Sequence, residues 1–138
     1  MTRVDFYILD SSDPDEVLRY CCRLVDKAYR QGHRICIVAS DEPQLKRLDD
    51  MLWMVRPESF LPHSEDTGDQ VTLCLGDQVG DHCDVLINLT PGVPATFSRF
   101  ERLAEIVCQE AQRLAASRER YSYYKHRGYP LHTHPIAA

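Results

Sequence analysis

The feature that most constrains the fold is an alternation of short apolar runs with amphipathic segments. The run at residues 34–39, Arg-Ile-Cys-Ile-Val-Ala, is almost entirely apolar, which is typical of a strand buried on both faces. Strand-like runs also lie at residues 4–9, 71–75 and 84–89. Helical patterns follow the first two strands. This order predicts an α/β fold with a largely parallel sheet and helices on its faces.

The predicted helices have recognisable boundaries. Asp13 and Pro14 suit the cap and first turn of one helix, and Gly32 suits its end. A second helix is expected to start at residues 40–43. After the breaks at Pro91, Gly92 and Pro94, the pattern predicts one long C-terminal helix from about Thr96 to Tyr124. Its apolar face would contain Phe97, Phe100, Leu103, Ala104, Val107, Ala111 and Leu114.

The size and composition are those of one globular domain. The chain has 138 residues, of which 27% are charged and 43% are hydrophobic, so we expect a single domain over residues 1–138. Residues 128–138, which include two prolines, are expected to form a loosely ordered tail. No apolar run approaches the roughly 20 residues that span a bilayer. With no signal-peptide pattern either, the prediction is a cytoplasmic protein without membrane contact.

The charges are unevenly distributed. The formal net charge is -5, yet residues 113–127 contain one acid, Glu119, among five cations: Arg113, Arg118, Arg120, Lys125 and Arg127. The acidic remainder would repel nucleic acid phosphates, whereas the basic strip suits a compact anionic partner. A solvated helix end that complements the helix dipole is the simpler interpretation. Charge alone does not separate these two.

The turns that follow the first two strands argue against nucleotide binding in the usual mode. Residues 10–14, Asp-Ser-Ser-Asp-Pro, contain two carboxylates and no glycine, and residues 40–43 are similar, so a pyrophosphate would be repelled. The carboxylates of Asp10, Asp13 and Asp41 instead offer ligands for Mg²⁺, as in phosphoryl-transfer enzymes. Helix capping is the competing interpretation of the same residues.

The six cysteines show no metal-binding or disulfide pattern. There is no C-x-x-C motif, and Cys36 and Cys74 lie inside apolar runs, where small core residues are common. We therefore expect buried free thiols and no resident metal or cofactor. A zinc site that includes His82 and Cys83 stays open as an alternative.

Two aromatic residues are not explained by core packing. Trp53 lies off the inner stripe of the second helix, and Phe60 follows the Pro57-Glu58-Ser59 turn. A Trp and a Phe near a surface edge are typical anchors of a protein interface. They would otherwise form a small apolar cluster under the loop at residues 55–70.

The C-terminal strip combines cations with tyrosines. On a helix, Arg118, Tyr121 and Lys125 share a face through their i, i+3 and i+7 spacing. An arginine binds a carboxylate through paired hydrogen bonds, and a tyrosine ring offers an apolar wall. This combination favours an acidic peptide that ends in a hydrophobic residue and a free carboxylate. Single-stranded nucleic acid uses similar groups, although the acidic remainder of the chain disfavours it.

At these residues the sequence resembles the chi subunit family of bacterial DNA polymerase III. The resemblance covers nearly the whole chain in order. It rests on four blocks: Leu48-Asp49-x-x-Leu52-Trp53, Glu58-Ser59-Phe60-x-Pro62-His63, Leu86-Ile87-Asn88-Leu89 and Arg118-x-Arg120-Tyr121-x-x-Tyr124-Lys125-x-x-Gly128-Tyr129. The second of these, together with Leu52-Trp53, is quite specific.

The resemblance implies a Rossmann-like, three-layer fold and a non-enzymatic accessory subunit. Family members pair with the psi subunit of the clamp loader and, in some bacteria, with a helicase related to DinG. They also bind the acidic C-terminal tail of single-stranded DNA-binding protein, and thus reach DNA only indirectly. Carried over, Trp53 and Phe60 match the psi or helicase surface, and Arg118 and Tyr121 match the tail-binding surface.

One departure from the family pattern concerns the tail-binding surface. A lysine that family members use there falls at Ser122 in this chain. The missing charge is then expected from Lys125, Arg120 or Arg113.

Overall fold

The structure of the protein is a computed structural model, and it describes residues 1–54, 70–76 and 84–136. Its centre is one six-stranded sheet in the order β3-β2-β4-β5-β1-β6, in which every strand pair is parallel. The expectation of a largely parallel sheet is therefore confirmed. The strands are β1 (Arg3–Leu9), β2 (Ile35–Ala39), β3 (Val71–Leu75), β4 (Val85–Asn88), β5 (Arg102–Val107) and β6 (Leu131–Ile136).

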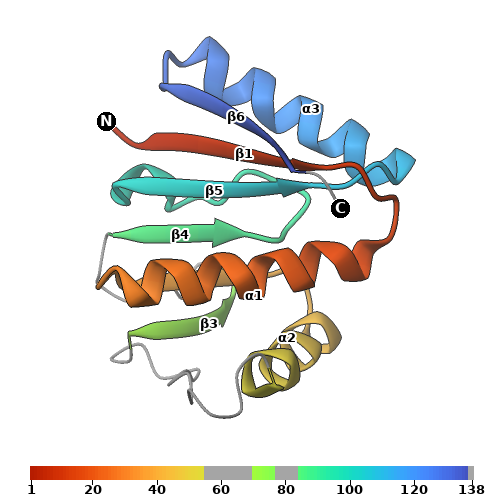
Figure 1. Cartoon of the computed structure of the whole chain (residues 1–138). Coiled ribbons are helices and arrows are strands. Elements are labelled where there is room, and N and C mark those ends of the chain that lie inside the picture. Colours follow the sequence, from red (N-terminus) through yellow and green to blue (C-terminus); the bar gives the residue numbers. More distant parts are fainter. Residues whose placement is uncertain (55–69, 77–83, 137–138) are drawn as a thin grey trace.

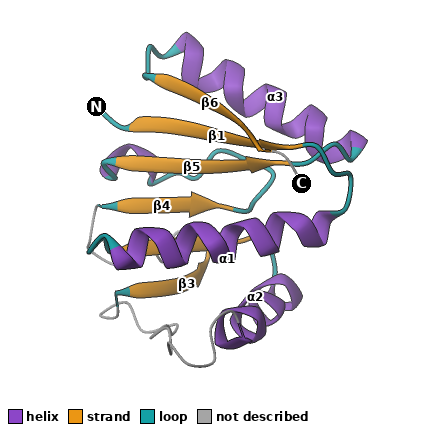
Figure 2. Cartoon of the chain, in the orientation of Figure 1, coloured by secondary structure: helices purple, strands orange, loops and turns teal. Residues whose placement is uncertain are grey.

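Helices cover the sheet on both sides, as Figures 1 and 2 show. The two early helices, α1 (Pro14–Arg30) and α2 (Glu42–Met54), pack on one face. The other face receives α3 (Ala111–His126) and the short 3-10 helix η1 (Phe97–Arg99). The result is a three-layer, Rossmann-like arrangement.

The alternation of side chains along β2 explains why this segment is apolar throughout. Ile35 and Ile37 point into the core under α1 and α2, while Cys36 and Val38 point into the core under α3 and η1. All five residues of β2 are buried. A strand that is covered on both faces has no solvent side on which a polar residue would be favoured.

The predicted C-terminal helix is confirmed as α3, but its expected extent from Thr96 to Tyr124 is wrong. The segment contains η1, then the strand β5, and only then α3. The residues at 103–108 are all buried, because β5 lies between β4 and β1 with both faces covered. The apolar positions of this run happen to match helical spacing, and a continuous apolar run does not distinguish a buried strand from a helix.

The prediction that residues 128–138 form a loose tail is also wrong for Leu131–Ile136, which form a strand. Gly128, with a φ of +78°, lets the chain turn back after α3. Residues 131–136 then form β6 alongside β1. His134 Nε2 lies 2.8 Å from Asp5 Oδ1, and its ring stacks on Tyr7 with centroids 4.9 Å apart. Pro135 is tolerated because β6 is an edge strand.

Among the residues that the structure describes, none of the helices is both long and apolar enough to cross a bilayer.

The contacts of β6 predict unequal roles for its two histidines. His134→Ala removes one of the partners of a buried carboxylate and a stacked ring, so we expect it to lower the free energy of unfolding by about 1–2 kcal/mol. His132→Ala, at an exposed position of the same strand, should change it by less than about 0.5 kcal/mol. Urea unfolding measures both variants, and equal effects would contradict the assigned contacts.

Candidate protein-binding surfaces

The start of α3 is fixed by an acidic cap. The Glu110 carboxylate accepts hydrogen bonds from the backbone N–H of Arg113 at 2.9 Å and of Gln112 at 3.2 Å. These bonds, that of Arg113 first, hold the pKa of Glu110 below its ordinary value. A negative charge at this position also complements the positive end of the helix dipole. The first turn of α3 is thus defined by a local interaction.

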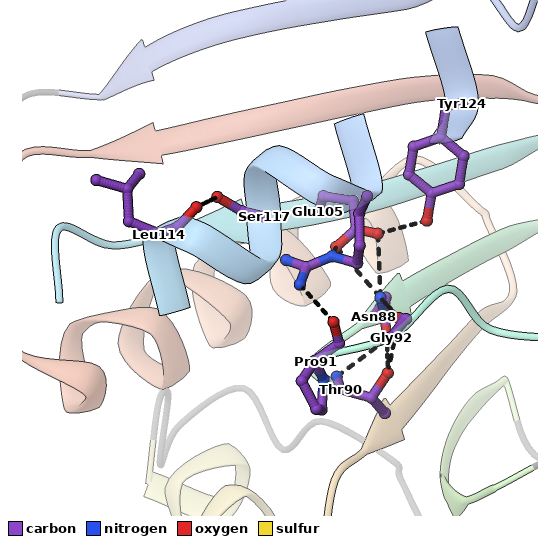
Figure 3. A network of polar contacts seen from close by, with 9 residues as sticks. Asn88, Thr90, Pro91, Gly92, Glu105, Leu114, Ser117 and Tyr124 are labelled. Atoms are coloured by element: carbon purple, nitrogen blue, oxygen red, sulfur yellow. Dashed lines mark hydrogen bonds and ion pairs between the residues drawn. The ribbon is translucent and has the colours of Figure 1, made fainter. Parts of the chain in front are cut away.

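The middle of α3 is tied to the sheet by a buried carboxylate, shown in Figure 3. Glu105, on β5, is 0% exposed. Arg120 donates from Nε to Glu105 Oε1 at 3.0 Å, and the Tyr124 hydroxyl donates to Oε2 at 2.6 Å. Both donors come from α3, four residues apart and therefore on one side of the helix.

The same carboxylate also ties in the end of β4. Asn88 Nδ2 lies 3.0 Å from Glu105 Oε2 and also donates to the carbonyl of Gly92 at 3.0 Å. Arg120 Nη1 donates to the carbonyl of Pro91 at 3.0 Å. The loop after β4, the strand β5 and the helix α3 are thus joined through one network, referred to below as the Glu105 network: Asn88, Pro91, Gly92, Glu105, Arg120 and Tyr124.

Burial dominates the electrostatics of this network. It raises the pKa of Glu105, although the charge of Arg120 and the hydrogen bonds from Tyr124, Asn88 and Arg120 oppose the rise. Burial also raises the pKa of Tyr124, with Glu105 adding to the effect. A carboxyl whose pKa is higher in the folded state contributes stability below its unfolded pKa and loses that contribution as the pH rises through the folded pKa. The charged form of Glu105 therefore depends on these donors.

The network corrects the expected place of Arg120. We predicted that Arg120 is among the cations that bind a partner's carboxylate. Arg120 is instead only 6% exposed, and its side chain already donates to Glu105. A charge desolvated in this way is held by its ion pair. The exposed cations of α3 include Arg113, Arg118 and Lys125, and Arg127 at its C-cap is also exposed.

Arg118, Tyr121 and Lys125, referred to below as the α3 row, all lie on α3 as expected. Arg118 and Lys125 are exposed, while Tyr121 is half-buried. The Tyr121 ring packs edge-on against Phe6 of β1, with centroids 5.2 Å apart and an interplanar angle of 66°. The Tyr121 ring is therefore supported by Phe6 and remains partly exposed, so that it offers an apolar surface between two cations.

A neighbouring contact at the end of α3 was not anticipated from the sequence. The Arg127 guanidinium lies 3.6 Å from the centroid of the Tyr123 ring, a cation–π contact. Tyr123 is half-buried, and its ring also packs edge-on near Phe97 at 6.3 Å. The position of the Arg127 guanidinium is thus set by the Tyr123 ring, which itself packs against the core.

The second predicted surface is described in part. Trp53 lies at the end of α2 and is 42% exposed, off the buried stripe of Leu45, Leu48 and Leu52. Met54 beside it is 74% exposed. Phe60 lies outside the described residues, so its position relative to Trp53 stays a prediction.

The strand-end carboxylates act as helix caps. Asp13 Oδ1 accepts from the backbone N–H of Asp15 at 3.0 Å, and Asp41 Oδ1 accepts from that of Gln44 at 2.9 Å. The capping interpretation is confirmed for both. No group of three or more His, Cys, Asp or Glu side chains suited to a metal is found within residues 1–54, 70–76 and 84–136.

The cysteines in the described part of the chain are buried and free, as predicted. Cys36 Sγ and Cys74 Sγ lie 3.1 Å apart and form a hydrogen bond between two thiols. Burial raises the pKa of Cys22 to about 12, so this thiol stays protonated at neutral pH. His82 and Cys83, the open zinc alternative, lie outside the described residues.

The sequence analysis missed Glu105, because residues 103–108 were assigned to a helix. The available signal was an acid inside an otherwise apolar run, Leu-Ala-Glu-Ile-Val-Cys. A buried acid requires a donor partner, which would have directed attention to the arginines and tyrosines downstream.

Comparison with known proteins gives one consistent result. A family model described as DNA polymerase III chi subunit, HolC, matches residues 1–132. The chain is 44% identical over 139 residues to the DNA polymerase III subunit chi of Pseudomonas aeruginosa, covering 99% of this chain and 98% of that protein. It is 29% identical over 143 residues to that of Escherichia coli, covering 96% and 97%. For Haemophilus influenzae the values are 28% over 137 residues, covering 95% of each.

The Glu105 network predicts strong coupling between its charged members. Glu105→Gln leaves the buried Arg120 without its counter-charge, and we expect a loss of about 3–5 kcal/mol in the free energy of unfolding, measured with urea. The double variant Glu105→Gln/Arg120→Met removes both charges and should be more stable than Glu105→Gln alone. Arg118→Met on the exposed side of α3 is the control, with an effect under about 0.5 kcal/mol. Additive losses in the double variant would contradict the coupling.

Proposed function

Because the chain belongs to the DNA polymerase III chi subunit family, we propose that it is a non-catalytic adaptor with two protein-binding surfaces. The α3 row binds the acidic C-terminal tail of single-stranded DNA-binding protein. The surface around Trp53 and Phe60 binds the psi subunit, which connects the adaptor to the clamp loader. The observation that carries the proposal is the α3 row, in which exposed cations flank a supported tyrosine ring.

The chemistry of the α3 row supports a peptide carboxylate as its ligand. Arg118 and Lys125 are exposed and stand i and i+7 on α3, about two helical turns apart. Tyr121 lies between them with its ring held against Phe6. A guanidinium forms paired bonds with a terminal carboxylate, and the ring edge gives an apolar surface to the last side chain of the tail.

The charge of the remaining surface supports selectivity for this row. The chain carries a formal net charge of -5, so an acidic tail is repelled from most of the molecule and attracted to α3. The same imbalance disfavours direct binding of single-stranded nucleic acid. With Ser122 at the position of the family lysine, the second cation is supplied by Lys125 or by Arg113, and both are exposed.

The exposed side chain of Trp53 supports the second surface. A tryptophan that is 42% exposed leaves a large aromatic area for a partner to bury, and such residues are frequent hot spots of interfaces. We assign psi to this surface, with a helicase related to DinG as the competing partner. The two surfaces lie on α2 and α3, which pack on opposite faces of the sheet, so both partners can bind at once.

The tail-binding proposal predicts a specific loss on removing one cation. A labelled acidic peptide that ends in phenylalanine should bind the protein in fluorescence anisotropy titrations, and more weakly as salt rises. Arg118→Ala removes a charge-assisted hydrogen bond and should weaken binding about tenfold or more. Lys46→Ala, which removes an exposed cation of α2, is the matched control and should leave the affinity within twofold.

Two further titrations complete this test. Amidation of the terminal carboxylate of the peptide should weaken binding to the wild-type protein and have little effect on Arg118→Ala. Equal binding of wild-type protein and Arg118→Ala would refute the assignment of the α3 row. Binding of a bare oligonucleotide at physiological salt, lost in Arg118→Ala, would favour direct nucleic acid binding instead.

The two surfaces are predicted to act separately. Trp53→Ala should abolish or greatly weaken capture of purified psi while leaving the peptide affinity unchanged. Arg118→Ala should have the opposite pattern, so each variant serves as the control for the other. Co-purification of tagged psi with each variant measures the first effect. If Trp53→Ala retains psi and instead loses the helicase, the second surface belongs to the helicase.

A further inference from the structure

A second basic site lies on the opposite side of the sheet from α3. A cavity of about 300 Å³ opens between α1 and the amino-terminal parts of β1, β4 and β5, with β6 at its rim. Figure 1 shows α1 crossing this face in front of the strands. The volume is at the lower end of the range for small-molecule sites, which restricts an occupant to a compact group.

Cations from three elements line this cavity. Arg3 lies on β1, Arg102 on β5 and Lys27 on α1. The one acid that lines it is Asp5, which is 4% exposed. The formal charges of Arg3, Lys27, Arg102 and Asp5 therefore leave an excess of two positive charges in the lining, in a chain whose formal net charge is -5. Such a local reversal of sign in a concave site concentrates anions.

The acid in the cavity is already satisfied. Asp5 Oδ1 accepts from Arg3 Nη2 at 3.1 Å and lies 2.8 Å from His134 Nε2. The second lining histidine, His33, pairs with Asp84 just outside the cavity at 3.1 Å. The side chains of Arg102 and Lys27 make no hydrogen bond or ion pair with any of the described residues. These two cations are therefore available to an incoming ligand.

Tyr7 adds a neutral donor to the cations. Its ring is held between His134, at 4.9 Å, and Tyr20, at 5.4 Å. Burial raises the pKa of Tyr7 to about 12, with Asp5 adding to the rise and Arg102 and Arg3 opposing it. The hydroxyl keeps its proton at neutral pH and lies near enough to both arginines to be affected by their charges. Because Tyr7 lines the same cavity as Arg3 and Arg102, it adds an O–H donor to this lining.

We propose that this cavity is a binding site for a phosphate group, held by Arg102, Lys27 and Arg3 with the Tyr7 hydroxyl as a further donor. A phosphate monoester carries about 1.5 to 2 negative charges near neutral pH, which is comparable with the excess of two in the lining. The arginine forks suit its oxygens, and lysine adds a point charge. This site shares no residue with the α3 row, so a test of phosphate binding does not depend on the tail-binding proposal.

A phosphorus NMR titration at constant ionic strength tests the site with inorganic phosphate. Addition of the wild-type protein should shift and broaden the phosphate resonance in a saturable way. Arg102→Gln and Lys27→Gln should each weaken the binding at least tenfold. Arg47→Gln, at an exposed position of α2, should leave it within twofold. Lys27 is exposed, so its variant keeps the test valid even if Arg102→Gln fails to fold.

The source of the phosphate is resolved by a second titration, with a dinucleotide that carries a 5′-phosphate and with its unphosphorylated form. Tighter binding of the phosphorylated dinucleotide than of inorganic phosphate, lost in Lys27→Gln, identifies a phosphate monoester as the ligand. Equal affinity identifies free phosphate. No saturable binding, equal binding by the wild-type protein and both cavity variants, or equal binding of the unphosphorylated dinucleotide would overturn the proposal.

Discussion

The interaction on which the architecture depends is the buried carboxylate of Glu105. It draws donors from two elements, Arg120 and Tyr124 of α3 and Asn88 of β4, and thereby fixes how α3 is rotated against the sheet. Since Arg120 and Tyr124 face inward, the intervening and flanking positions 118, 121 and 125 are turned roughly a third of a turn away, toward the surface. An ion pair of this kind adds little net stability, but it defines one orientation of the helix.

Positive and negative charges are concentrated in different parts of the molecule. Acids cap the helices and dominate the sequence, while cations gather on α3 and in the cavity beside α1. For the proposed function, this division favours selectivity, because most of the surface would repel an acidic tail. Two tyrosines of α3 have different environments. Tyr124 is buried and donates to Glu105, whereas Tyr121 packs against Phe6 and stays partly exposed.

The parts of the fold that follow local rules could be predicted from the sequence. The strand at residues 34–39 and the Asp13 and Asp41 caps depend on burial and on side-chain hydrogen bonds within a few residues. The strands β5 and β6 were missed because their identity depends on partners distant in the sequence: β5 lies between two strands, and β6 is held by β1. Arg120 was misplaced for the same reason, since its partner Glu105 belongs to β5. The exposure of Trp53 followed from helical spacing alone.

The central claim is that the Glu105 network holds α3 in place, and amide hydrogen exchange of a Tyr124→Phe variant tests it most directly. That change removes only the hydroxyl that donates to Glu105. The account predicts that amides in the second half of α3 exchange about tenfold faster or more, while those of α1, on the other face, stay nearly unchanged. An equal acceleration in α1 and α3, or no change in α3, would contradict it.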